Sequence, residues 1–187
     1  MGENPAGGAR RGDTADESGI SFVFDSTPLI HLVKAGHQRM IKKLKGEKYL
    51  PPTVYEEVVE VGKEKGFDDA LVTEELIERG VLKVKEPPKQ LLDRIKLHQD
   101  IHPGEAETLS LAKSLNAIAI TDDPVARAIA DMYDVMREGS YMVILRMLNA
   151  GEINKEKAKS SLRKLVDSGW RCDVELYENI LRRIEEL

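Results

Sequence analysis

Short apolar runs alternate along this chain with segments in which apolar residues recur every three or four positions. The runs are bounded by turn-forming or charged residues, which favours β-strands, and they lie at residues 20–24, 48–50, 81–85, 117–121 and 135–137. Helical patterns separate them, running from residue 54 onward and over residues 68–79, 88–100, 103–115 and 123–134. Strands that alternate with helices predict an α/β domain built on a parallel sheet.

The last part of the chain is helical in pattern throughout. Asn154 and Asp173 are favourable N-cap residues, and each precedes a segment whose apolar residues fall on one face. We therefore expect an α/β domain over residues 19–140 and a helical extension over residues 141–187 that packs on it. Residues 1–18 are small and polar, which predicts a disordered tail.

The composition limits the kinds of protein that this chain can be. With 41% hydrophobic and 33% charged residues among 187, the chain can bury a core and remain soluble. Its lone cysteine, Cys172, cannot form an intrachain disulfide, which favours a reducing, cytoplasmic setting. No apolar run approaches the roughly 20 residues that span a bilayer, so no membrane segment is predicted. The net charge of −5 excludes a global basic field for nucleic acid, but not a local patch.

Carboxylates follow two of the predicted strands at the point where each strand ends. Asp25 comes directly after residues 20–24, and Asp122 and Asp123 come after residues 117–121. The carboxyl ends of parallel strands meet at one edge of a sheet, where open α/β folds bind ligands. Acids brought together there suggest a divalent-metal site, because Mg²⁺ and Mn²⁺ prefer carboxylate oxygens. Asp25 and Asp123 could instead serve only as N-caps of the helices that follow them.

Helical phase adds a third acid to this set. Glu57 lies three residues after Val54 and beside Val58, close to an apolar stripe that also includes Val61, whereas Glu56 points away from it. A solvated glutamate on a helix surface is the other interpretation of Glu57.

The helix that begins near Pro103 offers two further acids, which phase separates. Glu105 falls between Leu109 and Ala112 in angle, whereas Glu107 falls on the polar side of the helix with its serines. Both acids are also favourable in a first turn because of the helix dipole, so Glu105 too has a purely structural alternative.

Four segments of the chain resemble successive motifs of PIN-domain proteins. They are FDSTPLIHL at 24–32, PPTVYEEV at 51–58, HPGEAETLSLA at 102–112 and TDDPVARAIA at 121–130. Their order and spacing are similar to those of the prokaryotic branch related to VapC-type toxin ribonucleases. The resemblance implies a three-layer α/β/α PIN-like fold with a parallel sheet and a helical C-terminal extension.

The same resemblance implies a metal-dependent ribonuclease site. Carried over motif by motif, the catalytic acids are Asp25, Glu57, Glu105 and Asp123, with Asp25, Glu105 and Asp123 as ligands of Mg²⁺ or Mn²⁺. The supporting residues are Ser26, Thr27, Glu107, Thr121 and Asp122. Many relatives carry aspartate where this chain has Glu105, which leaves Glu107 as a competing ligand, and Asp122 competes with Asp123 in the same way.

Weaker signals concern the substrate and the partners. Lys42, Lys43 and Lys45 belong to the densest basic run and could contact RNA, although a solvated helix face is the better explanation of the run. Arg127 could hold a phosphate or pair with Asp131 one helical turn away. The resemblance implies an RNA substrate, a homodimer and, for a toxin, a small antitoxin partner. The alternative is a PIN-fold scaffold that binds RNA or protein and cleaves little.

Overall fold

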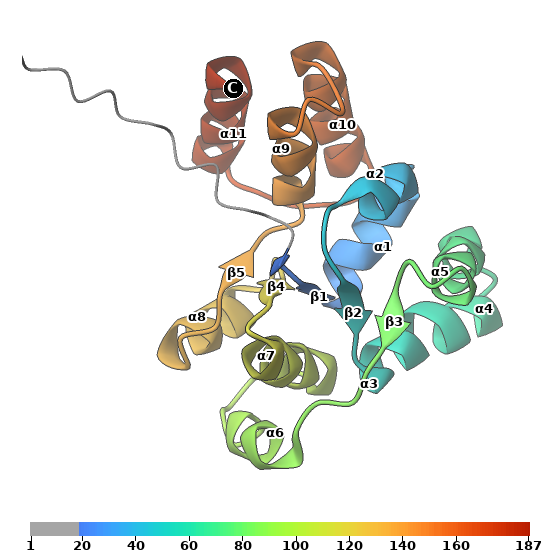
Figure 1. The fold of residues 1–187 in the computed structure, drawn as a ribbon, viewed down its shortest axis with the longest axis vertical. Coiled ribbons are helices and arrows are strands. Elements are labelled where there is room, and N and C mark those ends of the chain that lie inside the picture. The colour runs from blue at the N-terminus through green and yellow to red at the C-terminus, as the bar shows by residue number, and fades with distance from the viewer. Residues whose placement is uncertain (1–18) are drawn as a thin grey trace, which may run out of the picture.

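Five short strands form one parallel sheet at the centre of the molecule (Figure 1). The computed structural model describes residues 19–187, so the tail predicted for residues 1–18 lies outside the described residues. The sheet order is β3-β2-β1-β4-β5, and the strands are β1 (Phe22–Phe24), β2 (Lys48–Leu50), β3 (Lys83–Val84), β4 (Ile118–Ile120) and β5 (Arg137–Glu138). Every neighbouring pair is parallel, as the alternation of strands and helices predicted.

The two-residue period of the strands divides the interior into two cores. Phe22 and Phe24 belong to one core, whereas Val23, between them, belongs to the other. Val23 lies opposite Ala119 of β4, and both are fully buried. The sheet is therefore covered on both faces, which explains why its central strands are apolar throughout.

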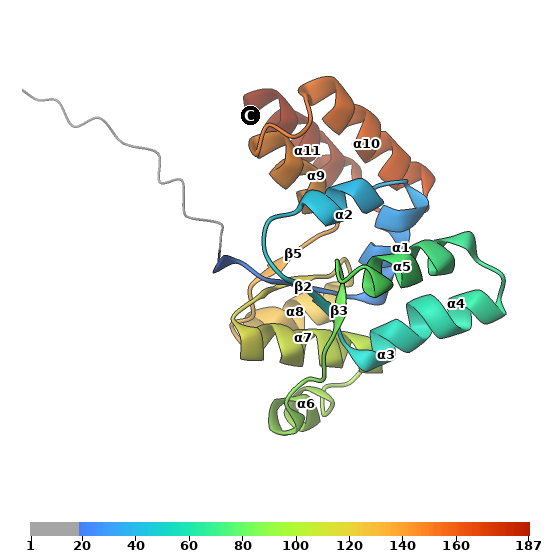
Figure 2. The same ribbon diagram turned by 45° about the vertical axis from the view of Figure 1, so that its right-hand side comes forward.

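The face that carries Phe22 and Phe24 is the more heavily covered. The helices on that side include α1 (Ser26–Lys34), α2 (Gln38–Lys43), α5 (Asp68–Glu78), α9 (Tyr141–Asn149), α10 (Lys155–Asp167) and α11 (Val174–Glu186) (Figure 2). The C-terminal helices bury their apolar stripes in this core through residues such as Ile144, Leu162 and Ile184. The expected N-caps are confirmed, because Asn154 accepts from the Lys157 amide and Asp173 accepts from the Leu176 amide.

The opposite face carries α6 (Lys89–Ile95), α7 (Pro103–Leu115) and α8 (Pro124–Met132) (Figure 2). Alanines dominate its core, including Ala106, Ala112 and Ala126. Together with the helices on the first face, these three helices complete the expected α/β/α arrangement.

A π-helical turn interrupts the helix after β2. The segment consists of α3 (Pro52–Tyr55), the π-helix η2 (Glu56–Glu60) and α4 (Val61–Glu64). A π-helix advances by fewer degrees per residue than an α-helix, so the apolar stripe predicted from α-helical phase is partly wrong. Val59 is fully buried, whereas the predicted stripe member Val61 is only partly buried. Such π-helical turns often occur at functional sites.

Two predicted boundaries are also wrong. The helix expected at 88–100 ends at Ile95, and Asp100 has a positive φ of 68° in the turn that follows. The last strand forms at Arg137–Glu138 and not at 135–137, because Val135 points into the core ahead of the ladder. None of the helices over residues 19–187 has both the length and the apolarity to cross a bilayer.

Candidate functional site

Asp25 lies at the carboxyl end of the central strand β1, where the backbone turns into α1. Its amide donates to the Ile120 carbonyl of β4 at 3.1 Å, so the residue also belongs to the edge between these two strands. The Asp25 carboxylate is 2% exposed, and its Oδ1 accepts from the Ser26 amide at 2.9 Å. It therefore caps α1, as the alternative interpretation held, while its second oxygen remains available for other contacts.

Thr121 connects the acids at the ends of β1 and β4. Its buried hydroxyl donates to Asp25 Oδ2 at 3.2 Å and accepts from the Asp123 amide at 3.4 Å. The prediction that Thr121 supports the site therefore agrees with its position, since it fixes the orientation of Asp25.

Glu57 reaches the same place from the π-helical turn. The Ser26 hydroxyl donates to Glu57 Oε2 at 2.6 Å, a short bond of the kind that a charged acceptor makes. Gly104 allows α7 to approach this carboxylate, since a Cβ atom there would lie 3.4 Å from Glu57 Oε1. The absence of a side chain at residue 104 thus leaves room beside the acid.

Glu105 enters the site from the first turn of α7. Its side chain is 9% exposed, and its Oε2 accepts from the His102 amide at 3.0 Å. A pocket of 210 Å³ lies between these elements, and its lining consists of Asp25, Ser26, Thr27, Glu57, His102, Gly104 and Glu105. Three of the four predicted catalytic acids therefore face one cavity.

The charges of these acids disfavour one another. Burial raises the pKa of Asp25 to about 7, and the nearby charges of Glu105 and Glu57 act in the same direction. The pKa of Glu105 is also raised, first by burial and further by the charges of Asp123 and Glu57. Carboxylates that repel each other in a cavity form a favourable environment for a cation.

Asp123 and Asp122 lie on a neighbouring pocket of 240 Å³, which shares Thr27 and Glu105 with the first. Asp123 Oδ1 accepts from the amides of Val125 and Ala126 and so caps α8. Its other carboxylate oxygen makes none of these bonds. Asp123 is therefore both a helix cap and a member of the acidic cluster.

Asp122 turns toward the C-terminal helices. Its Oδ1 accepts from the Ser140 amide at 2.9 Å, just before α9. Its Oδ2 is buried and has no hydrogen-bond partner among residues 19–187. Asp122 thus joins β4 to the C-terminal helices, which makes it the less suitable of the two as a primary ligand.

Glu107 does not face solvent, contrary to the phase argument. Its carboxylate accepts from the Thr53 amide at 3.0 Å and from the Thr53 hydroxyl at 2.8 Å, at the start of α3. The prediction failed because α7 is packed on several sides at once, so that Ser110, on the supposed polar side, is also fully buried. Glu107 holds two helices together instead of lining the pocket.

The basic residues singled out in the sequence lie elsewhere. Lys42, Lys43 and Lys45 occupy the end of α2 and the loop before β2, at the amino ends of the strands and opposite the acids. Lys43 is bound to Glu152. Asp131 accepts two bonds from Arg137, which arrives from β5, so its direct ion pair is not with Arg127. The charge of Arg127 still helps to lower the pKa of Asp131, after the larger effect of Arg137.

No pattern in the sequence pointed to Arg171 as a site residue. It lies in the turn between α10 and α11 and lines the second pocket together with Glu105, Asp122 and Asp123. Among the described residues that line the two acidic pockets, it is the only lysine or arginine. No local pattern could have revealed it, since the nearest of these acids, Asp123, is 48 positions away along the chain.

The turn that carries Arg171 is firmly attached to α1. The ring of His31 contacts the Ser168 carbonyl at 3.1 Å, and Gly169, with a φ of +103°, passes so close that a Cβ atom there would lie 3.3 Å from His31 Cε1. Trp170 is buried beside the ring of Tyr141. These contacts fix where the backbone presents Arg171.

The oxygen-rich cluster suits a hard divalent cation. Within the part of the chain that the structure describes, no three histidine, cysteine, aspartate or glutamate side chains are gathered closely enough to enclose an ion. The donors are nevertheless of the right chemical type, since carboxylates from β1, η2 and α7 line one cavity and interact through their charges. A bound cation would relieve that repulsion.

Comparison with known protein families gives one match. The family model described as DUF3368: PIN domain matches residues 21–186. The match covers the sheet, the acidic pockets and the C-terminal helices, and its description names no narrower branch. No curated protein matches the chain.

Proposed function

The chain belongs to a PIN-domain family, whose fold is generally that of a nuclease, and from this premise we propose that it is a Mg²⁺- or Mn²⁺-dependent endoribonuclease. The observation that carries the proposal is the convergence of Asp25, Glu57 and Glu105 on one pocket, with a raised pKa for Asp25 and Glu105. Stability alone would favour apolar residues at the buried positions of Asp25 and Glu105, so charges held there against repulsion indicate a functional site.

Asp25, Glu105 and Asp123 would hold the cation, and Glu57 completes the cluster. The bound ion supplies charge neutralisation at a phosphodiester and lowers the pKa of an attacking water. The protein contributes positioning: Thr121 orients Asp25, and Ser26 donates to Glu57. Arg171 adds a cation at the rim of the acidic pockets, where it can bind a phosphate oxygen of the substrate.

Cleavage of a mixed RNA by purified protein tests the proposal. We expect cleavage with Mn²⁺ or Mg²⁺, none with EDTA, and at least a 100-fold loss for Asp25→Asn, which removes a ligand charge with little change of shape. Glu56→Gln is the matched control, because Glu56 is an exposed acid on the same π-helical turn as Glu57. Cleavage in EDTA, or an Asp25→Asn variant as active as the parent, would contradict the proposal.

The narrower proposal is that this ribonuclease is the toxin of a toxin–antitoxin pair. It is supported by the four motifs that resemble VapC-type proteins, and by nothing in the fold itself. Induced expression in a bacterium should arrest growth, and the Asp25→Asn variant should not. If cells that express active protein grow normally, the toxin proposal is rejected and the ribonuclease proposal is unaffected.

A further inference from the structure

A third pocket, of 460 Å³, lies between α2 and α10, remote from the acids. Its lining consists of Gly36, His37, Arg39, Met40, Lys43, Met147, Glu152, Ile153, Asn154, Lys157 and Lys164, none of which lines the two acidic pockets. His37 follows the C-terminal end of α1, whereas Asp25 precedes its first residue. The nine-residue helix α1 therefore separates the two regions by roughly 14 Å.

The charge of this pocket is strongly positive. Four lining residues carry a lysine or arginine charge, and the single acid, Glu152, is already bound to Lys43. Arg39, Lys157 and Lys164 are exposed, and their side chains form no hydrogen bond or ion pair with any residue that the structure describes. Three cations thus face one cavity without compensation.

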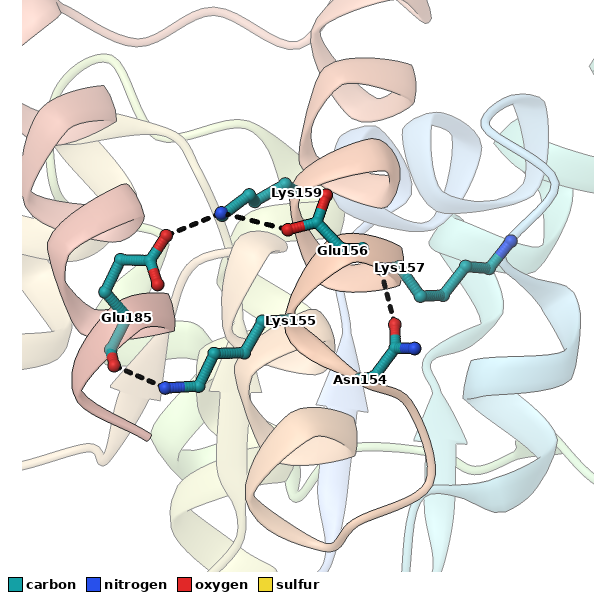
Figure 3. A network of polar contacts seen from close by, with 6 residues as sticks. All are labelled: Asn154, Lys155, Glu156, Lys157, Lys159 and Glu185. Carbon is teal, nitrogen blue, oxygen red and sulfur yellow. Dashed lines mark hydrogen bonds and ion pairs between the residues drawn. The ribbon is translucent and has the colours of Figure 1, made fainter.

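The lysines of α10 are divided between two sides of the helix (Figure 3). Lys159 is held by Glu156 at 3.2 Å and by Glu185 of α11 at 2.5 Å, and Lys155 donates to the Glu185 carbonyl. Lys157 points the other way, away from α11, as Figure 3 shows. Lys155 and Lys159 therefore attach α10 to α11, whereas Lys157 lies on the side of the pocket.

The pKa of His37 responds to the positive charge of the pocket. Its ring contacts the Ser161 carbonyl at 2.9 Å, and burial lowers the pKa of His37. The charges of Lys164 and Lys157 lower it further, which shows that both ammonium groups act on the pocket floor. An anion that binds between Lys157 and Lys164 would offset the repulsion between their positive charges and a protonated His37.

Part of the remaining lining is apolar and can contact the uncharged part of a ligand. Met40 and Met147 are largely buried, and Ile153 is partly buried beside them. Methionine side chains adapt to flat and irregular ligands. Pockets of a few hundred Å³ that combine apolar walls with a few charged groups are typical of small-molecule sites.

We propose that this cationic pocket binds a small phosphorylated ligand of the mononucleotide class, with its phosphates on Lys157, Lys164 and Arg39 and its organic body against the two methionines. A partly enclosed cavity favours a small ligand over an RNA strand, whose backbone needs an open groove. The site does not depend on the proposed ribonuclease activity.

Calorimetric titration with ADP in an EDTA buffer tests the site, since EDTA keeps metal out of the acidic pockets. We expect binding in the micromolar range for the parent protein. The double variant Lys157→Gln with Lys164→Gln should raise Kd at least tenfold. The matched control, Lys155→Gln with Lys159→Gln, removes the same charge from the same helix and should change Kd less than twofold. Circular dichroism verifies that both variants are folded.

Four outcomes would overturn the proposal. They are no binding at millimolar ADP, an equal loss of affinity in both double variants, equal affinity for inorganic phosphate, and tighter binding of a ten-nucleotide RNA that the Lys157 and Lys164 changes abolish. Equal affinity for inorganic phosphate would show that the pocket recognises phosphate alone and not the organic part of the ligand. Tighter binding of the RNA would show that the ligand is a nucleic acid and not a small molecule.

Discussion

The hydroxyl of Thr121 donates to Asp25 Oδ2 at 3.2 Å across 96 positions of the chain. The two residues end adjacent parallel strands, so one hydrogen bond fixes the orientation of the most buried acid of the site. The carboxylate is thereby held toward the pocket that Glu57 and Glu105 also line.

Loss of this hydroxyl should impair cleavage without unfolding the protein. Thr121→Val keeps the shape of the side chain but removes the donor, and we expect cleavage to fall by about tenfold, the effect of a residue that orients a ligand. Thr121→Ser retains the donor and should stay within about threefold of the parent. Initial rates at saturating Mn²⁺ make the comparison, and equal rates for Val and Ser would show that Asp25 needs no such support.

Metal-free protein should be less stable at neutral pH than at mildly acidic pH because of Asp25. The folded protein holds the Asp25 proton up to about pH 7, whereas the unfolded chain releases it near 3.8. Over that window the folded state binds more protons, so its stability falls as the pH rises and levels off above about 7. Asp25→Asn should therefore gain stability relative to the parent, by on the order of 2–4 kcal/mol at pH 7.5 and almost nothing at pH 4.

Urea denaturation in EDTA at several pH values measures this difference. If the free energies of unfolding of the parent and Asp25→Asn differ by the same amount from pH 4 to 7.5, the predicted link between the protonation of Asp25 and stability is contradicted. Added Mn²⁺ should raise the melting temperature of the parent at pH 7.5 and leave Asp25→Asn nearly unchanged, since the cation binds to the charged form.

Glu105 and Glu107 should differ in the property that each change affects. Glu105→Gln removes a charge that faces Asp25 and Asp123, so metal affinity and cleavage should both fall by at least tenfold. Glu107→Gln weakens the two bonds to Thr53, so it should cost about 1 kcal/mol of stability and change cleavage little. Calorimetry with Mn²⁺, cleavage rates and denaturation together distinguish the two, and a larger cleavage loss for Glu107→Gln would reverse the assignment.

Arg171 should act on the substrate and not on the metal. Arg171→Gln removes the cation at the acidic rim, and we expect kcat/KM for RNA to fall by about tenfold, mainly through KM. Mn²⁺ affinity should stay equal or increase slightly, because a neighbouring positive charge is gone. Arg163→Gln, an exposed arginine of α10, is the control for a general charge effect, and equal losses in both variants would refute a local role.

The predicted homodimer gains no support from the C-terminal helices, since their apolar faces are buried within the chain, for example at Leu162, Leu165 and Ile184. Large apolar side chains remain exposed at Leu97, Met132 and Val174. Light scattering at micromolar concentration should give twice the chain mass of 20.9 kDa if the dimer exists. A mass equal to one chain would reject it.

The sequence by itself determined the features that depend on short-range physics. Asp25 and Asp123 end apolar strands and precede helices, and this local pattern was enough to place both at one sheet edge. Asn154 and Asp173 cap helices because a capping side chain bonds to amides two or three residues away. Glu105 was selected because its helix keeps regular α-helical phase over 13 residues.

Only the tertiary structure decided the features that depend on which elements meet. The π-helical turn at Glu56–Glu60 shifted the buried face from Val61 to Val59, since packing overrides ideal helical phase. Glu107 accepts a hydrogen bond from Thr53, and Asp131 accepts one from Arg137, and both contacts join separate elements of the fold. Arg171 reached the acids, and Lys157 reached α2, because the folded chain brings segments together that its order keeps far apart.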